Sequence, residues 1–209
     1  MKIGYFITAC NEFQELARLL LMLKTNISDN DCIGILLDET NHSDEVRELC
    51  EKFTLPNDSI RLAYAPLNND FATFKNTGYE LLHDCDWIFQ LDADEIPSEV
   101  LMNNLHAILE MNPIVELIYV PRINTVEGLT QNHIEQWGWN VNNEGWVNWP
   151  DYQGRIYKRD KNIKWAGKVH EKIEGHKALS QIPPTEQLAL HHPKTITKQE
   201  QQNKFYETL

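Results

Sequence analysis

The sequence has few cysteines and no long apolar run. Its cysteines are four scattered residues without a C-x-x-C pair, Cys10, Cys32, Cys50 and Cys85. This spacing argues against a disulfide framework and against a cysteine zinc site. The longest apolar stretches break at Lys24 and Asp38, short of the roughly 18 apolar residues of a membrane span. No secretory signal precedes the polar pair Asn11–Glu12. We therefore expect a cytoplasmic protein without an integral membrane segment.

Basic residues are also scarce. The chain of 209 residues has 19 Lys and Arg against 31 Asp and Glu, a formal charge of −12. This balance argues against nucleic acid as a partner, because nucleic-acid binding needs a basic face. An anionic ligand would need a metal or local cations to offset the acidic surroundings. Since 42% of the residues are hydrophobic, the composition predicts a folded single domain spanning residues 1–209.

Strand and helix signals alternate over residues 1–120. Apolar runs predict strands at 3–8, 32–37, 60–64, 87–91 and 115–120. Helices are predicted after a cap at Asn11, after a cap at Ser43, over 71–82, and from Ser98 to about Met111. Such alternation predicts a mostly parallel, nucleotide-binding type of sheet flanked by helices.

The pattern changes from Pro121 onwards. Residues 121–151 lack helical period, and they contain four of the six tryptophans, Trp137, Trp139, Trp146 and Trp149. A hairpin turn is predicted at 142–145, short strands at 154–158, 163–165 and 168–173, and a final helix opened by a capping box of Thr197 and Glu200. We expect a smaller mixed β region with a C-terminal helix. The tryptophans are more often core residues than a ligand platform, but their Asn-rich surroundings favour at least one sugar-facing ring.

The most distinctive motif is the acidic segment that follows the apolar run 87–91. Asp92, Asp94 and Glu95 lie within four residues, and the spacing of two directs Asp92 and Asp94 to the same side of an extended chain. Ligands of open α/β sheets bind just beyond the carboxyl ends of the strands. Close carboxylates there favour a hard cation such as Mg²⁺ or Mn²⁺. A structural alternative is an acidic loop that caps the helix at Ser98.

This segment resembles the D-x-D region of family 2 glycosyltransferases with a GT-A fold. Other segments of the chain resemble further motifs of that family, in the same order along the sequence. Residues 8–12 resemble the family's N-E segment, 36–44 its acidic segment, and 71–78 its F-[SA]-x-x-R-N-x-G helix. Residues 154–158 and 165–171 resemble the R-[LI]-[FY]-[RK]…G-x-[VI]-H-E pattern of one branch, and His191–His192 its closing segment. Two departures are an acidic segment about one residue longer that lacks its glycine, and Lys75 in place of the usual Arg.

The resemblance implies a GT-A type α/β domain, with a nucleotide-sugar half at 1–120 and an acceptor-side half at 121–209. Nucleotide-sugar contacts are expected at Thr8, Ala9, Asn11, Glu12, Asp38, Lys75, Asp92 and Ala93. Mn²⁺ or Mg²⁺ is expected on Asp92, Asp94 and a histidine, with His192 preferred to His191. Glu171 is the expected general base, with Asp151 as the reserve.

The implied activity is a metal-dependent, inverting transfer of a hexosyl-type sugar from a nucleotide-diphosphate sugar to an acceptor. A UDP-sugar is favoured as donor, the acceptor is an unknown glycan, lipid or protein, and a homodimer is left open. One alternative is a sugar nucleotidyltransferase, although residues 8–11 lack the glycine-rich loop of that class. Another is a non-catalytic, carbohydrate-binding protein of transferase-like fold.

Overall fold

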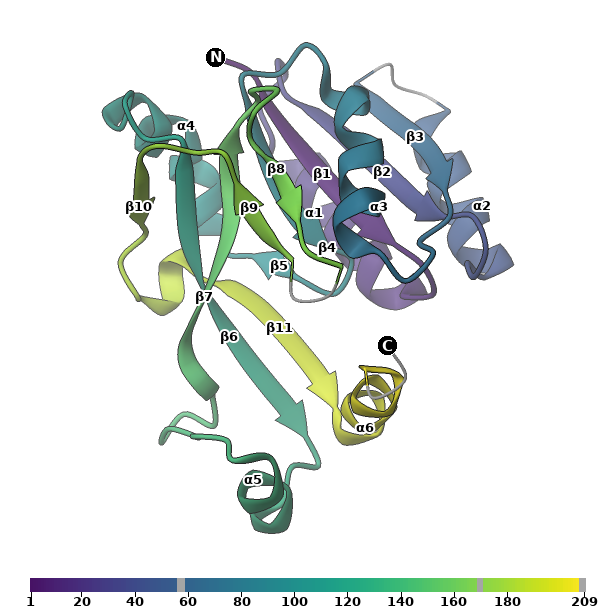
Figure 1. The fold of residues 1–209 in the computed structure, drawn as a ribbon, viewed down its shortest axis with the longest axis vertical. Coiled ribbons are helices and arrows are strands. Elements are labelled where there is room, and N and C mark those ends of the chain that lie inside the picture. The colour runs from purple at the N-terminus through teal and green to yellow at the C-terminus, as the bar shows by residue number, and fades with distance from the viewer. Residues whose placement is uncertain (56–58, 169–170, 207–209) are drawn as a thin grey trace.

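The computed structural model describes residues 1–55, 59–168 and 171–206 (Figure 1). The first half contains β1 (Ile3–Ala9), α1 (Phe13–Asn26), β2 (Cys32–Asp38), α2 (Asp44–Thr54), β3 (Ile60–Ala65), α3 (Phe71–Thr77), the 3₁₀ helix η1 (Gly78–Leu82), β4 (Trp87–Asp92), β5 (Ile96–Pro97) and α4 (Glu99–Met111). The second contains β6 (Leu117–Glu127), α5 (Gln131–Trp137), β7 (Val147–Lys158), β8 (Lys164–Ala166), β9 (Lys172–Glu174), β10 (Leu179–Gln181), η2 (Glu186–Leu188), β11 (Leu190–Thr195) and α6 (Ile196–Tyr206).

Within the described ranges, nine strands form one sheet in the order β3-β2-β1-β4-β7-β6-β11-β5, with β10 paired to β6. Strands β3, β2, β1 and β4 are parallel, as the strand–helix alternation predicts. Strand β7 then runs antiparallel between β4 and β6, whereas β11 runs parallel to β6. Strands β8 and β9 form a separate antiparallel hairpin. The first half is therefore a parallel nucleotide-binding type of sheet, and the second half adds the mixed β region.

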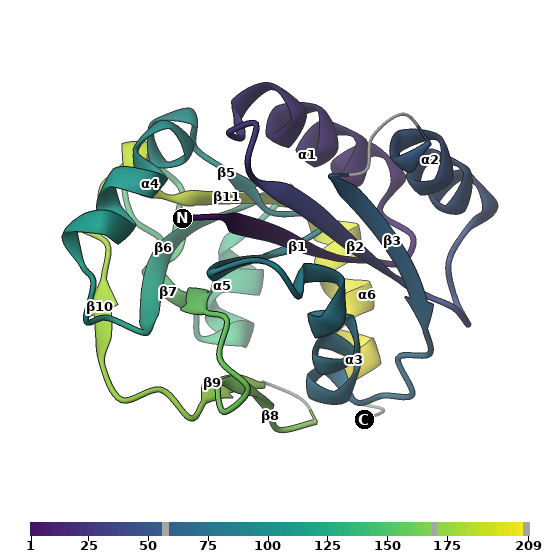
Figure 2. The same ribbon diagram turned by 90° about the horizontal axis from the view of Figure 1, so that it is seen from above.

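The sheet is covered on both faces (Figure 2). Helices α1, α2 and α4 bury their apolar stripes on one face, where they share a core with alternate residues of β1, β2 and β4. On the other face, η1 and the end of α3 pack with the β8–β9 hairpin. Because β1, β2 and β4 are covered on both faces, they read as continuous apolar runs in the sequence. None of the helices in the described ranges is long and apolar enough to cross a bilayer.

Three expectations about helices need correction. The segment 121–151 contains α5, a helix that the periodicity missed because none of its residues is buried. Helix α6 begins at Ile196, and it is Thr195 rather than Thr197 that accepts the capping hydrogen bond, from the Lys198 amide. Helix α1 is preceded by Glu12 as its N-cap instead of Asn11. At α5 and α6 a side-chain cap, which leaves no hydrophobic pattern, defines the start of the helix, whereas Glu12 makes no capping hydrogen bond to α1.

Candidate functional site

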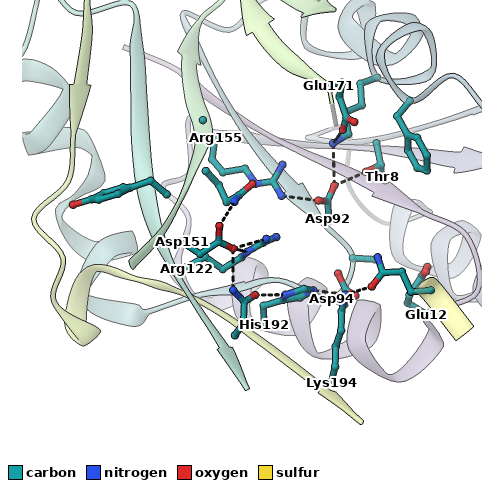
Figure 3. Close-up of a pocket in the computed structure, with 18 of the residues that line it drawn as sticks. Thr8, Glu12, Asp92, Asp94, Arg122, Asp151, Arg155, Glu171, His192 and Lys194 are labelled. Atoms are coloured by element: carbon teal, nitrogen blue, oxygen red, sulfur yellow. Dashed lines mark hydrogen bonds and ion pairs between the residues drawn. The ribbon is translucent and has the colours of Figure 1, made fainter. Parts of the chain in front are cut away.

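A cavity of about 810 Å³ lies where the carboxyl ends of β1, β2 and β4 meet β6, β7 and β11 (Figure 3). Its lining includes most of the residues that the sequence analysis selects, namely Thr8, Ala9, Glu12, Asp38, Lys75, Asp92, Ala93, Asp94, Asp151, Glu171 and His192. Asn11 is exposed and does not belong to the lining. Thr8 and Glu171 both line this cavity, although they lie 163 positions apart in the chain. The two halves of the domain form this cavity together.

The register of β1 and β4 positions the first carboxylate of the acidic segment. Thr8 and Asp92 are register partners, and the Thr8 hydroxyl donates to Asp92 Oδ1 over 3.1 Å. Arg155 Nη2 donates to Asp92 Oδ2 over 2.6 Å, and Lys75 Nζ lies 3.3 Å from Oδ1. Burial raises the pKa of Asp92, but the charges of Arg155 and Lys75 outweigh it and hold that pKa below its usual value. Asp92 is thus an anion that three protein groups already contact.

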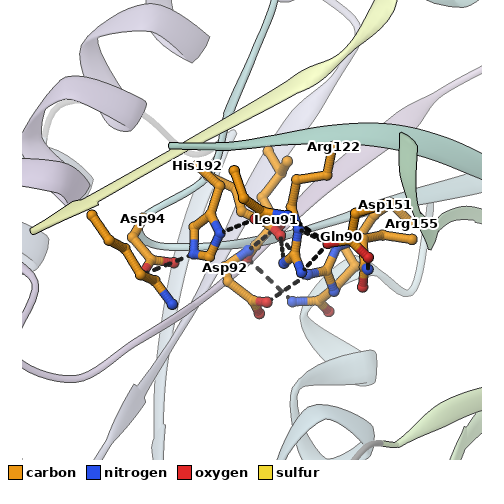
Figure 4. Close-up of polar contacts among 12 residues, drawn as sticks. Gln90, Leu91, Asp92, Asp94, Arg122, Asp151, Arg155 and His192 are labelled. Carbon is orange, nitrogen blue, oxygen red and sulfur yellow. Dashed lines mark hydrogen bonds and ion pairs between the residues drawn. The ribbon is translucent and has the colours of Figure 1, made fainter. Parts of the chain in front are cut away.

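Asp92 belongs to an alternating chain of charges that continues through Arg155 (Figure 4). Arg155 Nη2 also donates to Glu95 Oε1 over 2.6 Å, and Arg122 Nη1 reaches the same oxygen over 2.8 Å. Arg122 then pairs with Asp151 Oδ2 over 2.6 Å, because the two are register partners on β6 and β7. The guanidinium groups of Arg155 and Arg122 thus link the three carboxylates directly, with no need of a metal ion between them. The buried Nε of Arg155 has no hydrogen-bond partner among the described residues. A buried donor of this kind is expected to bind a water molecule or a ligand.

Asp94 and His192 form the part of the site best suited to a divalent cation. Asp94 Oδ2 lies 3.4 Å from His192 Nε2. Asn124 Nδ2 donates to Asp151, so its carbonyl oxygen faces His192, whose Nδ1 lies 2.7 Å from it. The Nδ1–H of His192 is thereby the donor to Asn124. Nε2 of His192 faces Asp94, where it donates to the carboxylate if it carries a proton and offers a lone pair to a metal ion if it does not. A carboxylate with an oriented imidazole fits Mn²⁺ or Mg²⁺, which completes its coordination with water and phosphate oxygens.

The acid at position 94 also has cationic neighbours. Lys198 Nζ lies 3.4 Å from Asp94 Oδ2, and Lys194 lines the same cavity. Burial raises the pKa of Asp94, but the hydrogen bond and charge of His192, with Lys194 and Lys198, hold it below its usual value. Desolvation lowers the pKa of Lys194. These lysines supply the local positive charge that an anionic ligand needs in an acidic protein.

Another group of possible metal ligands lies at the opposite edge of the sheet. Cys32, Asp84 and Cys85 have ligand atoms within 4.8 Å of one another. Asp84, however, is bound on both oxygens by Arg61 and on one of them by Lys2. The two cationic side chains already paired with Asp84, the only carboxylate of this group, disfavour a metal cation there.

The two candidate bases differ in how fully the protein contacts them. Glu171 Oε1 accepts one hydrogen bond, from Lys75 Nζ over 2.8 Å. Asp151 accepts from Arg122, Asn124 and Gln153, and the charge and hydrogen bonds outweigh burial to keep its pKa below the usual value. A carboxylate that accepts fewer hydrogen bonds is better able to take a proton, which favours Glu171 over Asp151 as the base. Val169 and His170, which precede Glu171 in the matched motif, lie outside the described residues.

Asp38 and Glu12 hold the loops that follow β2 and β1 at the edge of the cavity. The Asp38 carboxylate is 1% exposed and accepts from Thr40, Asn41 and the Leu67 amide. Glu12 Oε2 accepts from the amides of Cys10 and Asn11. Both acids shape the β1 and β2 ends through these bonds, and both also line the cavity.

Sequence reasoning missed Arg122, Asn124 and Lys194 as members of the site. A signal existed for the first two, because they alternate with buried Pro121 and Ile123 in the period of two that marks a strand with one polar face. No local pattern indicates their partners, since Arg122, Asn124 and His192 meet only through the pairing of β6 with β7 and β11.

Comparison with known proteins gives a likeness of fold. No family model matches the sequence, and no curated protein is significantly similar to it. Among solved structures, S. aureus TarS 1–349 with UDP matches with a TM-score of 0.64 at 10% identity, over 92% of this chain and 60% of that one. The same fragment with UDP-GlcNAc matches with a TM-score of 0.60 at 12% identity, over 93% and 59%.

A longer TarS structure matches with a TM-score of 0.63 at 11% identity, over 92% of this chain and 37% of TarS. The chain thus spans about 60% of the TarS fragment and less of the longer protein. At this identity the likeness shows the arrangement of strands and helices alone. The fold that the sequence analysis expects is confirmed: an α/β domain of GT-A type, with a largely parallel central sheet flanked by helices.

Proposed function

We propose that the protein is a glycosyltransferase that moves a sugar from a nucleotide-diphosphate sugar, with a UDP-sugar as the favoured donor, to an acceptor hydroxyl. The observation that carries this proposal is the Asp94–His192 pair, which the β4 end and β11 bring together at the carboxyl edge of a nucleotide-binding type of sheet. The TarS fragment, similar in fold, has been solved with UDP and with UDP-GlcNAc. Both ligands belong to the class that this cavity suits.

The cation-binding residues would be Asp94 and His192, with Mn²⁺ or Mg²⁺ as the ion. Bound there, the ion would offset the charge of the departing nucleotide diphosphate. Asp92 joins the ligand set only if it releases Arg155, so we assign it to the donor ribose or sugar side. Lys75 and Lys194 add positive charge on the walls of the cavity, and Lys198 adds it beside Asp94. Together these groups account for an anionic donor in a chain of charge −12.

Glu171 is our proposed base. It would accept the proton of the acceptor hydroxyl while that oxygen attacks the anomeric carbon from the face opposite the leaving group, which inverts the configuration. Lys75 holds the carboxylate toward the cavity through its ion pair. Asp151, with its several hydrogen-bond donors, is the reserve and otherwise orients Arg122 and Asn124.

A sugar nucleotidyltransferase is the second candidate, and the glycine-free segment 8–11 argues against it. A non-catalytic carbohydrate-binding protein is the third, and the coexistence of Asp94, His192 and Glu171 in one cavity argues against that. The difference is measurable, because only the transferase hydrolyses or transfers the sugar of its donor while leaving the nucleotide diphosphate intact.

The test is UDP binding with and without Mn²⁺, followed by donor hydrolysis over UDP-, GDP- and dTDP-sugars. The wild type should gain thermal stability with UDP plus Mn²⁺, because a ligand that binds only the native state raises its melting temperature. Asp94→Ala should lose the Mn²⁺-dependent part, whereas Asp29→Ala, which alters an exposed acid outside the cavity, should retain it. Equal UDP affinity in the wild type and Asp94→Ala would contradict the metal assignment.

A further inference from the structure

Residues 137–149, here called the aromatic arm, join α5 to the start of β7 and have no role in the function proposed above. The arm lies beside the end of β6 and the start of β7, away from the parallel strands β1, β2 and β3 (Figure 1). Its four tryptophans form two contacting pairs. The ring centroids of Trp137 and Trp139 are 4.7 Å apart, and those of Trp146 and Trp149 are 4.9 Å apart. All four rings are half-buried, so none is a core residue.

Polar contacts fix the backbone of the arm. The Asn140 amide donates to Asn148 Oδ1 over 2.9 Å, and the Asn148 amide donates to the Asn140 carbonyl over 2.7 Å. Val141 pairs with Val147, and Asn142 closes the turn by accepting from the Trp146 amide. Asn148 adopts a left-handed backbone (φ 54°), a strained conformation for a non-glycine residue. Strain held by paired contacts beside a cavity is a feature that clusters at ligand sites.

Trp139 is the one arm tryptophan among the described residues that lines the cavity. Trp137 packs behind it and is itself stacked on His133, with ring centroids 5.1 Å apart and an interplanar angle of 13°. Gly138, in a left-handed conformation (φ 64°), turns the chain between the two tryptophans. The Trp139 ring is therefore held in place before any ligand arrives, which limits the entropy lost on binding.

The lining of the same cavity also contains several amide side chains and one amine. Asn148 comes from the arm itself, Lys194 from β11, and Gln199 and Gln202 from α6. A sugar ring has an apolar C–H face and a rim of hydroxyl groups. A fixed aromatic ring with hydrogen-bonding side chains beside it matches both features.

Other ligands that stack on tryptophan fit less well. The nucleobase of the donor belongs near Thr8 and Asp38, at the ends of β1 and β2. A cationic ligand would meet the amine of Lys194 in the same cavity. An acyl chain would need an apolar channel, whereas the arm is rich in asparagine, with residues 140, 142, 143 and 148.

We infer that Trp139 and Asn148 form a saccharide subsite, so that the acceptor is a carbohydrate instead of a lipid or a peptide. The inference rests on the proposed function, since it names the acceptor class for the same cavity. Glu171 and Trp139 reach the cavity from separate elements, the β8–β9 hairpin and the arm. We therefore expect the subsite to bind a sugar unit of an oligosaccharide.

The test is binding of labelled protein, with UDP and Mn²⁺ present, to an array of printed oligosaccharides, lipids and peptides. The wild type should bind a subset of the oligosaccharides. Trp139→Ala and Trp139→Leu should weaken that binding by at least about tenfold, equivalent to about 1.4 kcal/mol, whereas Trp139→Phe, which keeps a ring, should retain most of it. Trp146→Ala, an arm tryptophan outside the cavity lining, is the matched control and should bind as the wild type does.

Calorimetry with UDP and Mn²⁺, run on the same wild-type preparation, distinguishes a failure of the saccharide subsite from a failure of the proposed function. A wild type that binds UDP but no oligosaccharide overturns this inference alone, and one that binds neither overturns the proposed function with it. Equal losses in Trp139→Phe, Trp139→Leu and Trp146→Ala would show a structural role of the arm and would also overturn the subsite. Binding of the wild type to lipids or peptides alone would also overturn the saccharide subsite.

Discussion

Lys75 illustrates how a single residue serves both folding and the site. It is 4% exposed, lies between Glu171 at 2.8 Å and Asp92 at 3.3 Å, and stacks over the Trp165 ring at 4.4 Å from its centroid. The sequence analysis treats it as a nucleotide-contacting residue. The structure adds that it joins the first acidic residue of the site to the proposed base. A donor phosphate that attracts Lys75 would therefore also change the surroundings of Glu171.

Replacement of the proposed base should affect turnover and not donor binding. Glu171→Gln keeps the shape of the side chain but cannot accept a proton at neutral pH. We expect kcat to fall by about 100- to 10,000-fold with donor affinity changed little. Asp151→Asn is the parallel variant, and transfer rates with the true acceptor are the measurement. A normal rate in Glu171→Gln with a large loss in Asp151→Asn would move the base to Asp151.

Asn124 should control metal affinity without touching the metal. Asn124→Leu removes the acceptor that fixes the Nδ1–H of His192, and it also removes one donor to Asp151. Loss of such an outer partner typically lowers metal affinity by about 10- to 100-fold. Titration of Mn²⁺ in the presence of UDP measures the effect, and Asn104→Leu, on the exposed face of α4, is the control. Identical Mn²⁺ affinities in the two variants would show that His192 is not a ligand.

Among the elements, the β8–β9 hairpin depends on contacts with α3. Asn76 donates to the Trp165 carbonyl over 2.8 Å and accepts from the Trp165 amide over 3.0 Å. Gly78, which follows on η1, packs so close to Phe6 that an added Cβ would lie 2.2 Å from the ring. These two contacts give physical reasons for an asparagine and a glycine two residues apart in the matched helix motif. The Asn76 hydrogen bonds hold the β8–β9 hairpin, whose two strands flank Glu171, whereas the Gly78 contact packs η1 on β1.

Gly175, at the end of this hairpin, should be intolerant of any side chain. Its φ is +87°, and a Cβ would lie 1.8 Å from the Asn162 carbonyl oxygen. We expect Gly175→Ala to lower the free energy of unfolding by roughly 3 kcal/mol or more, from left-handed strain and overpacking together. Gly145→Ala has a similar φ of +81° with no atom within 4 Å, so only strain of about 1 kcal/mol applies. Urea unfolding of both variants measures the difference, and equal losses would contradict the clash.

At the scale of the whole molecule, the carboxylates of the cavity make stability depend on pH. Asp38, Asp92, Asp94 and Asp151 all have pKa values below the usual one in the folded protein. The unfolded chain, with ordinary values near 3.9, binds these protons first as the pH falls. Their contribution is therefore complete above about pH 5 and is lost as the pH falls through the folded pKa values.

We expect the melting temperature to change little through these groups between pH 7 and pH 5, and to fall steeply below about pH 4. Asp151→Asn removes one of the four and should make the acid branch shallower. Thermal unfolding at constant ionic strength from pH 7 to pH 3 is the measurement. A melting temperature that stays constant to pH 3 would contradict the charge network.

The homodimer stays a prediction about the whole molecule, and light scattering would test it.

Much of the fold follows from local chemistry in the sequence. The apolar runs that become β1, β2 and β4 are continuous because both faces of these strands are buried, and Ser43 and Ser98 cap α2 and α4 as expected. The acidic segment after β4 indicates where the site lies, because parallel strands bring their carboxyl ends to one edge. By contrast, α5 buries no residue, so its sequence carries no period that would reveal it.

The sequence alone determined the α/β class, the acidic edge of the site and eleven of the residues that line the cavity. Only the tertiary structure decided which of them touch. Arg122 reaches Asp151 and Glu95, and Asn124 orients His192, because β6 pairs with β7 on one side and β11 on the other. The physical reason is that hydrophobic periodicity reports burial along one element, whereas ion pairs and hydrogen bonds depend on register between elements distant in the chain.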